Sequence, residues 1–266
     1  MENSKLLELI KNTPNAIFSI PNPTDEMKLI ALKNNGLMLE YINPPTREMQ
    51  VIALENNARA IKFIPDPTEE MMIKAIQGGW TNLEYIKNPT NKVLELAIGQ
   101  AGWAIKYVKD PSEELQLLAV RINYDSIKFI KDPTERTQQE AVSINYEALR
   151  FINSPTYATE LAAIKNNERA IKFINDIDRN KILEFLRINF LVIKYVMYDI
   201  SKEDLEQVLK EVLSKEDVEA TYVRDFLNYN TIDDSYINRM DKILLIYTYG
   251  SKKAKRIAVD EKLKII

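Results

Sequence analysis

The sequence contains no cysteine and no histidine, and only 6 of its 266 residues are glycine. Without cysteine no disulfide can form, and zinc sites built from cysteine and histidine are excluded as well. The same absences rule out cysteine nucleophiles and any catalytic triad or general base that needs an imidazole. Only carboxylate, lysine or tyrosine chemistry stays open to an enzyme with this composition.

Long hydrophobic runs are also missing. The stretch NFLVIKYVMY is interrupted by Lys194 and is much shorter than the ~20 apolar residues of a membrane span. The opening MENSKLLELIKN has no uninterrupted apolar region of the kind that signal peptides carry. The formal net charge of -3 disfavours general binding to nucleic acid or anionic membranes. These features predict a cytoplasmic protein that does not bind membranes.

What the sequence does contain is a repeat with a constant period of 22 residues. Seven units carry a proline followed by threonine or serine, and a matched aliphatic residue stands nine positions after each of these prolines. The register extends back to AIFSI (16–20) and forward through VIKYV (192–196), which gives about nine units from residue 1 to about 198. The prolines of the register are Pro23, Pro45, Pro67, Pro89, Pro111, Pro133 and Pro155.

Each unit is predicted to form two short helices. Threonine after proline is a good N-cap, and acidic residues follow it in PTDEM, PTEEM and PSEEL. Asparagine recurs at the following turn, for example at Asn57 and Asn167, where we expect it to end the first helix in a left-handed conformation. In the second segment, AIKFI, a rotation of about 100° per residue places the aliphatic and aromatic side chains in one arc opposite the lysine. We therefore expect its aromatic residues to be packed and its lysine to face water.

One such unit cannot bury both of its faces, so neighbouring units must stack. The sequence therefore predicts an all-α fold, a right-handed α-solenoid of about nine 22-residue helix-turn-helix repeats with a helical C-terminal cap. The predicted domains are an α-solenoid repeat domain over 1–200 and a helical C-terminal cap or small terminal domain over 201–266. Within the latter, Ser-x-x-Asp motifs predict helix starts at Ser201 and Ser214, and a further helix is expected over 232–248, ending at Gly250.

The unit PTxEMxxxAIxNNxxAIKFIxD resembles a family of short tandem two-helix repeats of unknown function, found in bacteria, large DNA viruses and protists. The resemblance covers residues 1 to about 198. The unit is also loosely similar to leucine-rich-variant repeats, which are short α-solenoid units. Neither resemblance carries catalytic residues, and both imply a helical solenoid used for binding. The first also implies a viral, phage or bacterial protein, such as a host-directed or anti-defence inhibitor.

Motifs that would indicate an enzyme are absent from the sequence. The segments GQAG (99–102) and YGSKKAKR (249–256) have the wrong spacing for a dinucleotide-binding turn or a phosphate-binding loop. The acidic residues stand at helix starts, where the helix dipole and solvation explain them. We therefore expect no enzymatic activity, no cofactor and no metal site.

Departures from the repeat mark the candidate binding residues. The asparagine turn is replaced by GGW (78–80) in repeat four and by QAGW (100–103) in repeat five, while repeats six and seven carry tyrosine there. Repeat scaffolds bind through positions that vary, and exposed aromatic rings are typical of contact surfaces. Alternatively, the rings fold back on the neighbouring turn and only seal the edge. The candidate partner-binding residues are Gly78, Gly79, Trp80, Gly102, Trp103, Tyr124 and Tyr146.

A column of basic residues runs opposite the predicted core arc. It could bind phosphates or an acidic surface, or it could be a solvated face whose lysines complement helix dipoles. The candidate anion-binding residues are Lys106, Lys128, Arg150, Lys172 and Lys194.

Two functions follow from these features. The first is a non-enzymatic scaffold that binds another protein, whose identity the sequence does not give. The second is a protein that binds nucleic acid or a nucleotide ligand through the basic column and the turn aromatics. If the glycines of repeat four serve a partner, replacing Gly78 and Gly79 by asparagine should leave stability unchanged or raise it.

Overall fold

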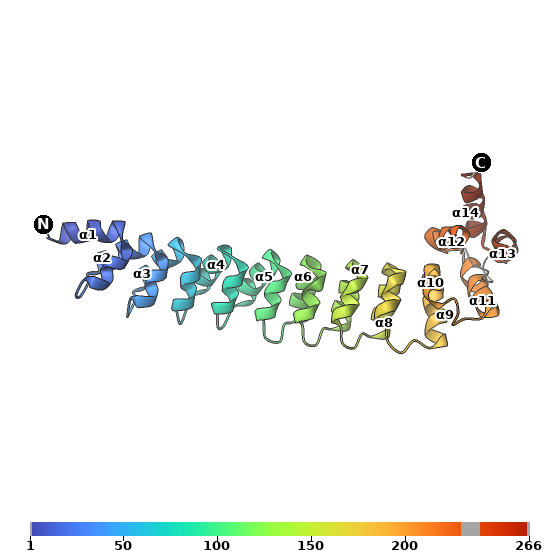
Figure 1. The fold of residues 1–266 in the computed structure, drawn as a ribbon, viewed down its shortest axis with the longest axis horizontal. Helices are drawn as coiled ribbons and strands as arrows, with labels where there is room; N and C mark the ends of the chain where they lie inside the picture. The colour runs from blue at the N-terminus through green and yellow to red at the C-terminus, as the bar shows by residue number, and fades with distance from the viewer. Residues whose placement is uncertain (1, 230–239, 265–266) are drawn as a thin grey trace. The chain divides into compact units, whose positions relative to one another are not determined.

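The computed structural model describes residues 2–229 and 240–264. These residues form α-helices and 3₁₀-helices and no strand, and the short helices pack successively as an all-α helical-repeat solenoid. Figure 1 shows the α-helices of neighbouring repeats side by side within each part of the chain. Among the described helices, none is both long enough and apolar enough to cross a membrane.

Each repeat consists of an α-helix followed by a 3₁₀-helix. The α-helices are α1 (Glu2–Asn12), α2 (Asp25–Asn34), α3 (Arg47–Asn56), α4 (Glu69–Gln77), α5 (Asn91–Gln100), α6 (Glu113–Ile122), α7 (Glu135–Ile144), α8 (Tyr157–Asn166) and α9 (Arg179–Ile188). The 3₁₀-helices are η1 (Pro14–Ser19), η2 (Gly36–Tyr41), η3 (Ala58–Phe63), η4 (Trp80–Tyr85), η5 (Gly102–Tyr107), η6 (Tyr124–Phe129), η7 (Tyr146–Phe151), η8 (Glu168–Phe173) and η9 (Phe190–Val192). In the ninth repeat, η9 continues directly into α10 (Ile193–Val196).

The predicted helix starts and core columns of the repeats are confirmed. The Thr24 side chain accepts a hydrogen bond from the Met27 N–H at 3.3 Å, and Thr46 caps α3 in the same way. The aliphatic position nine residues after each proline is buried in every repeat, as at Ile76 and Ile98. An alanine one residue before it is fully buried as well, which lets neighbouring α-helices approach closely.

The turn asparagines have a different conformation from the predicted one. Asn57 is extended, with φ -146° and ψ 109°, and its side-chain oxygen accepts a hydrogen bond from the Arg59 N–H at 3.0 Å. The same geometry recurs at Asn35, Asn145, Asn167 and Asn189. The left-handed ending predicted for these residues is therefore wrong. Because a second helix begins immediately, the asparagine caps that helix instead of terminating the first one.

The second segment of each repeat is a 3₁₀-helix, and this changes which side chains are buried. Side chains three residues apart are eclipsed in a 3₁₀-helix, so Ile61 and Ile64 share the buried side of η3. The aromatic position between them is more open than we predicted. Tyr41 is 62% exposed and Phe129 is 41% exposed, so the expectation that these rings are packed is wrong for both.

The chain forms two compact units, Met1–Thr137 and Gln138–Ile266, here called unit 1 and unit 2. This division falls within α7, whereas the 22-residue register ends near residue 200. The division into 1–200 and 201–266 follows the repeat pattern and stays a prediction.

Among the described residues of unit 2, the repeats are followed by α11 (Lys202–Leu213), α12 (Ala220–Asn228), α13 (Lys242–Tyr249) and α14 (Lys252–Leu263). The start predicted at Ser201 is confirmed, since its hydroxyl accepts the Asp204 N–H at 3.1 Å. The start predicted at Ser214 is wrong, because that hydroxyl donates to the Glu211 carbonyl at 3.0 Å and thus ends α11. Gly250 directly follows α13 as predicted, while residues 232–239 of the expected helix lie outside the described residues.

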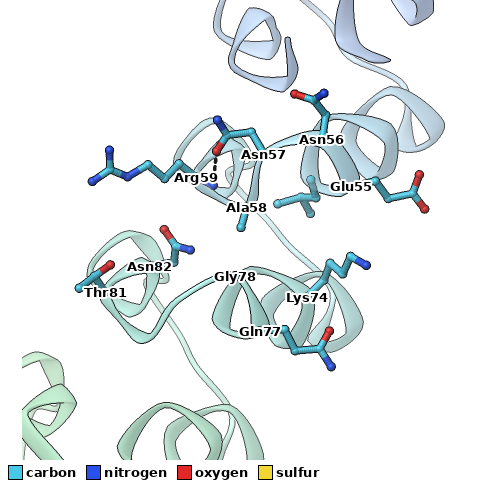
Figure 2. A pocket seen from close by; sticks show the side chains of 11 residues that line it. Glu55, Asn56, Asn57, Ala58, Arg59, Lys74, Gln77, Gly78, Thr81 and Asn82 are labelled. Carbon is cyan, nitrogen blue, oxygen red and sulfur yellow. Dashed lines mark hydrogen bonds between the residues drawn. The ribbon is translucent and has the colours of Figure 1, made fainter. Parts of the chain in front are cut away.

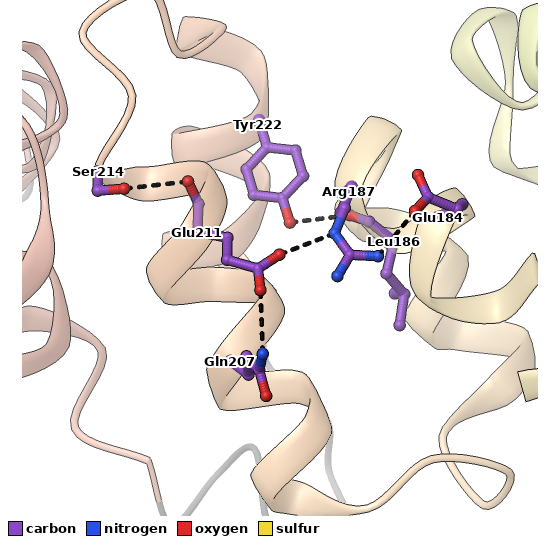
Figure 3. A network of polar contacts seen from close by, with 7 residues as sticks. All are labelled: Glu184, Leu186, Arg187, Gln207, Glu211, Ser214 and Tyr222. Atoms are coloured by element: carbon purple, nitrogen blue, oxygen red, sulfur yellow. Dashed lines mark hydrogen bonds and ion pairs between the residues drawn. The ribbon is translucent and has the colours of Figure 1, made fainter. Parts of the chain in front are cut away.

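A polar network joins the last repeat to α11 and α12 (Figure 3). The Arg187 guanidinium donates to the Glu211 carboxylate at 2.9 Å, and this hydrogen bond lowers the pKa of Glu211. The Tyr222 hydroxyl donates to the carbonyl of Leu186 at 2.8 Å, and burial raises its pKa. The terminal helices are therefore tied to α9 by hydrogen bonds as well as by apolar packing.

Candidate functional site

The two tryptophans of unit 1 each contact the following repeat. The Trp80 ring lies on the ring of Tyr107, with 6.2 Å between the centroids. The Lys106 ammonium lies 5.4 Å from the centroid of the Trp80 ring and 4.6 Å from that of Tyr107. Trp80 is thus half-buried beneath a cation, an arrangement that stabilises the edge between repeats four and five.

Trp103 is more open and is held by hydrogen bonding. Its indole N–H donates to one carboxylate oxygen of Asp125 at 2.8 Å, and Lys128 donates to the other at 2.7 Å. Burial alone would raise the pKa of Asp125, but these two hydrogen bonds outweigh it and hold the pKa below its usual value. The Trp103 side chain remains 40% exposed.

We call these residues the tryptophan cluster. It comprises Trp80, Trp103, Lys106, Tyr107, Asp125 and Lys128, all in unit 1. Trp80 is the first residue of η4, whereas Trp103 is the second residue of η5. The two rings therefore occupy different positions of the repeat. The sequence pattern placed both tryptophans at neighbouring turns, but it did not show that the Trp80 ring is half-buried and the Trp103 ring is more exposed.

Two of the candidate glycines are explained by packing within the chain. A Cβ on Gly102 would lie 2.2 Å from the Ala119 carbonyl oxygen, and one on Gly78 would lie 2.2 Å from the Ala58 Cβ. Their missing side chains therefore give room to the adjacent repeat. Gly79 has φ +148°, a conformation that side chains rarely adopt. All three glycines have a structural role apart from any partner.

The glycine pair of repeat four changes how its α-helix ends. In repeat three the Asn57 N–H donates to Ala53 O at 2.8 Å, but Gly79, at the equivalent position, donates to Ile76 O at 2.9 Å. The buried Asn82 side chain donates to the carbonyl of Ala75 at 2.8 Å. Asn82 was not among the residues predicted from the sequence. The available signal was a polar residue at a position where several other repeats have alanine.

The two candidate tyrosines differ in their surroundings. Tyr124 is half-buried at the start of η6 in unit 1. Tyr146, in unit 2, stacks on Phe173 with 6.2 Å between ring centroids and an angle of 28° between the planes. A hydrogen bond to Tyr146 raises the pKa of Arg169. Tyr146 therefore seals the edge between repeats seven and eight.

The candidate anion-binding residues all have partners within the chain. In unit 1, Lys128 pairs with Asp125, and Lys106 lies over two rings. In unit 2, Lys194 pairs with Glu168 at 3.1 Å. Also in unit 2, the Arg150 guanidinium lies 5.8 Å from the ring centroid of Phe173, and the Lys172 ammonium lies 5.1 Å from that of Tyr195. These contacts favour a structural role for much of the column's charge.

A cleft of about 610 Å³ opens between repeats three and four (Figure 2). Its upper wall in the figure is the end of α3 and the start of η3, including Glu55 and Ala58. Its lower wall comes from α4 and η4, including Lys74, Gly78 and Thr81. The sequence pattern at Gly78 pointed to this turn but not to a cleft.

Comparisons with models of protein families, with curated proteins and with solved structures give no match, so the function is argued from the site alone.

Proposed function

We propose that this chain is a non-enzymatic, cytoplasmic scaffold that binds another protein through the tryptophan cluster. The observation that carries the proposal is the Trp103 ring, which is 40% exposed while its indole N–H is fixed on Asp125. Tryptophans in such positions are frequent anchors of protein interfaces. A ring whose orientation is already fixed loses less conformational entropy on binding.

The charges around the ring define the rest of the contact. Lys106 and Lys128 border the two tryptophans, and both residues are exposed beside the rings. A partner surface with an apolar centre and acidic groups at its rim would complement this arrangement. The resemblance to the short-repeat family suggests a more specific form of the function, in which a viral or bacterial protein inhibits a host or defence protein.

Nucleic acid is the alternative ligand class. Rings interleaved with lysines, as at Trp80, Lys106 and Tyr107, also occur in proteins that stack single-stranded bases. Against this, the carboxylate of Asp125 lies between Trp103 and Lys128 and would repel a phosphate. We therefore favour a protein partner.

The test compares two tryptophan variants with an exposed aromatic outside the cluster. The immobilised chain is exposed to proteins and nucleic acids of its source, and retained species are identified for the wild type, Trp103→Ala, Trp80→Ala and Tyr198→Ala. Tyr198 is the control because it is 93% exposed in unit 2. We expect one or more proteins whose retention falls at least tenfold with Trp103→Ala, is unchanged with Tyr198→Ala and persists at raised salt. Because Trp80 is also packed, its variant is interpreted only alongside its melting temperature.

Two results would contradict the proposal. Retained proteins that are insensitive to Trp103→Ala would place the interface elsewhere. Retention of nucleic acid that falls steeply with salt would support the alternative, because phosphate binding releases counterions.

A further inference from the structure

A side-chain carboxamide joins repeat three to the turn of repeat two. The Asn56 side-chain oxygen accepts the Gly36 N–H at 2.7 Å, and its side-chain nitrogen donates to the carbonyl of Lys33 at 2.8 Å. The Asn56 side chain thus pairs with a carbonyl in the last turn of α2 and with the first N–H of η2. Neither group has a hydrogen-bond partner within its own helix.

The same arrangement recurs in unit 2. The Asn166 side-chain oxygen accepts the Tyr146 N–H at 3.2 Å, and its nitrogen donates to the carbonyl of Ser143 at 2.8 Å. The donor and acceptor stand three residues apart in both turns. A backbone donor and acceptor at this spacing therefore bind a carboxamide, and Asn56 and Asn166 supply it at these two turns.

At other turns an amide side chain pairs with only one backbone group, either a carbonyl or an N–H. Gln100 donates to the carbonyl of Ile76 at 2.8 Å, and the Gly102 N–H is accepted by the side chain of Asn123 at 2.9 Å. An amide side chain from the next repeat is again the group that is used. Several repeats thus place asparagine or glutamine here, whereas Ile122, Ile144 and Ile188 occupy the position equivalent to Asn56 in others.

The turn of repeat three has the same donor and acceptor but lacks the amide. Gly78 stands 22 residues after Asn56 and carries no side chain. The equivalent groups are the carbonyl of Glu55 and the N–H of Ala58, and no hydrogen bond from another described residue reaches either of them. Both residues line the cleft of about 610 Å³, and the Ala58 side chain points toward Gly78 and packs against it (Figure 2).

We propose that this cleft binds the side-chain carboxamide of an asparagine or glutamine from a partner polypeptide. The ligand oxygen accepts the Ala58 N–H, and the ligand nitrogen donates to the Glu55 carbonyl, as Asn56 does one repeat earlier. A carboxylate offers no donor to the carbonyl and an aliphatic side chain satisfies neither group. A ligand that leaves either backbone group without a partner in the complex loses binding free energy, and this loss is the basis of the discrimination.

The neighbourhood of the cleft indicates a polypeptide as the source of the amide. A second cleft of about 310 Å³ shares Leu54, Glu55 and Lys74 with the first and adds the apolar walls of Val51 and Met71. A chain segment that places an apolar side chain there can present its amide to Ala58. This inference rests on the proposed protein-binding function. Its test uses a single asparagine with both ends blocked and does not involve the tryptophan cluster, so either proposal can fail while the other holds.

The ligand-side experiment uses the full chain labelled with nitrogen-15. N-acetyl-asparagine methylamide is titrated and compared with the isosteric N-acetyl-leucine methylamide. We expect saturable shifts of the Ala58 and Gly78 amide signals with a millimolar Kd for asparagine, and at least fivefold weaker binding of leucine. Equal binding of the two compounds, or no shift at these amides, would overturn the proposal.

The protein-side experiment removes the donor at a position where the repeat already tolerates proline. Pro14 and Gly36 are the residues equivalent to Ala58 in repeats one and two. Asn57 before it is extended, as a residue preceding proline should be. We expect Ala58→Pro to abolish the shift of the Gly78 amide and Ala58→Gly to keep it. Binding that survives in Ala58→Pro would show that the N–H is not used; the asparagine and leucine comparison decides the matter even if this variant does not fold.

Discussion

The junction between repeats two and three differs from the junction between repeats three and four in one respect. At both, a carbonyl at the end of an α-helix and the first N–H of the following 3₁₀-helix need a hydrogen-bond partner. In the first, Asn56 reaches across and satisfies one donor and one acceptor of the preceding turn. In the second, Gly78 offers no side chain to the equivalent groups of repeat three, and Gly79 and Asn82 change how α4 itself ends. One junction is closed by its own side chain, and the other keeps a polar cleft.

The comparison shows that a departure from a repeat consensus is not by itself evidence of binding. Gly79 and Asn82 belong together, since the altered helix end of repeat four needs both the unusual φ and the buried amide. The groups that the missing amide leaves without a partner among the described residues are a different observation. They are the Ala58 N–H and the Glu55 carbonyl, and both residues line the cleft.

Restoring the consensus should have the largest effect. Sequence analysis predicts that Gly78→Asn with Gly79→Asn is neutral or stabilising, but the structure reverses this expectation. A Cβ at 78 would clash with Ala58, and a side chain at 79 would be strained at φ +148°. We expect a loss of roughly 2–4 kcal/mol in the free energy of unfolding, from overpacking and backbone strain together. Urea denaturation measures it.

The control for this double variant is Gly99→Asn, because a Cβ there would have no neighbour within 4 Å. We expect its stability to change by less than about 0.5 kcal/mol. A double variant as stable as the wild type would mean that repeat four can adopt the turn of repeat three.

Removing the compensating amide should have the next largest effect. Asn82→Ala leaves the Ala75 carbonyl without its side-chain donor in a buried position, where Asn82 is only 3% exposed. We expect a loss of about 1–3 kcal/mol in unfolding free energy, read from the denaturation midpoint. Thr81→Ala, at the exposed neighbour, should stay within about 0.5 kcal/mol. If both variants behaved alike, Asn82 would not be what holds this helix end.

Much of the fold was predictable because it depends on patterns that repeat. The capping threonines and the aliphatic column recur with the period, and a strict period fixes stacking regardless of detail. The nature of the second helix was not predictable in the same way. AIKFI fits both an α-helix and a 3₁₀-helix, and the 3₁₀ form occurs with a side-chain cap, as at Asn57, and without one, as at Ala101.

The location of the candidate site stays a prediction, and the contacts of its residues could not be predicted from the sequence. Tryptophan and glycine single out two turns, but the groups that Trp103 and Gly102 contact lie in the next repeat, at Asp125 and Ala119. Contacts between neighbouring repeats depend on the length and conformation of individual side chains, which the repeat period does not specify. Asn82 was missed for the same reason, since its role appears only once the helix end is seen.

Opening the closed junction is the next prediction. Asn56→Ala should cost about 0.5–1.5 kcal/mol, because a hydrogen-bonded amide is lost at a partly exposed turn. It should also create a second amide site, so that N-acetyl-asparagine methylamide now shifts the amide signal of Gly36. Asn34→Ala is the control, because Asn34 bonds only within its own helix, to Ile30. If the Gly36 amide signal of Asn56→Ala does not shift, removal of the asparagine is not sufficient to create an amide site.

The smallest effect concerns how pH acts on junctions held by charge rather than by amides. The folded pKa of Asp125 lies below its unfolded value because the hydrogen bonds from Lys128 and Trp103 outweigh burial. Its contribution to stability is therefore present above the unfolded pKa of about 4 and is lost as pH falls through the folded pKa. Since the Asp125 side chain is 22% exposed and that of Lys128 is 36% exposed, we expect this carboxylate to contribute at most about 1 kcal/mol to the free energy of unfolding.

Asp125→Asn should thus be less stable than the wild type at pH 7, and the difference in stability should disappear below about pH 4. The amide junction at Asn56 has no titrating group, so the cost of Asn56→Ala should be the same at both pH values. A gap for Asp125→Asn that does not change with pH would show that its carboxylate contributes by shape and not by charge.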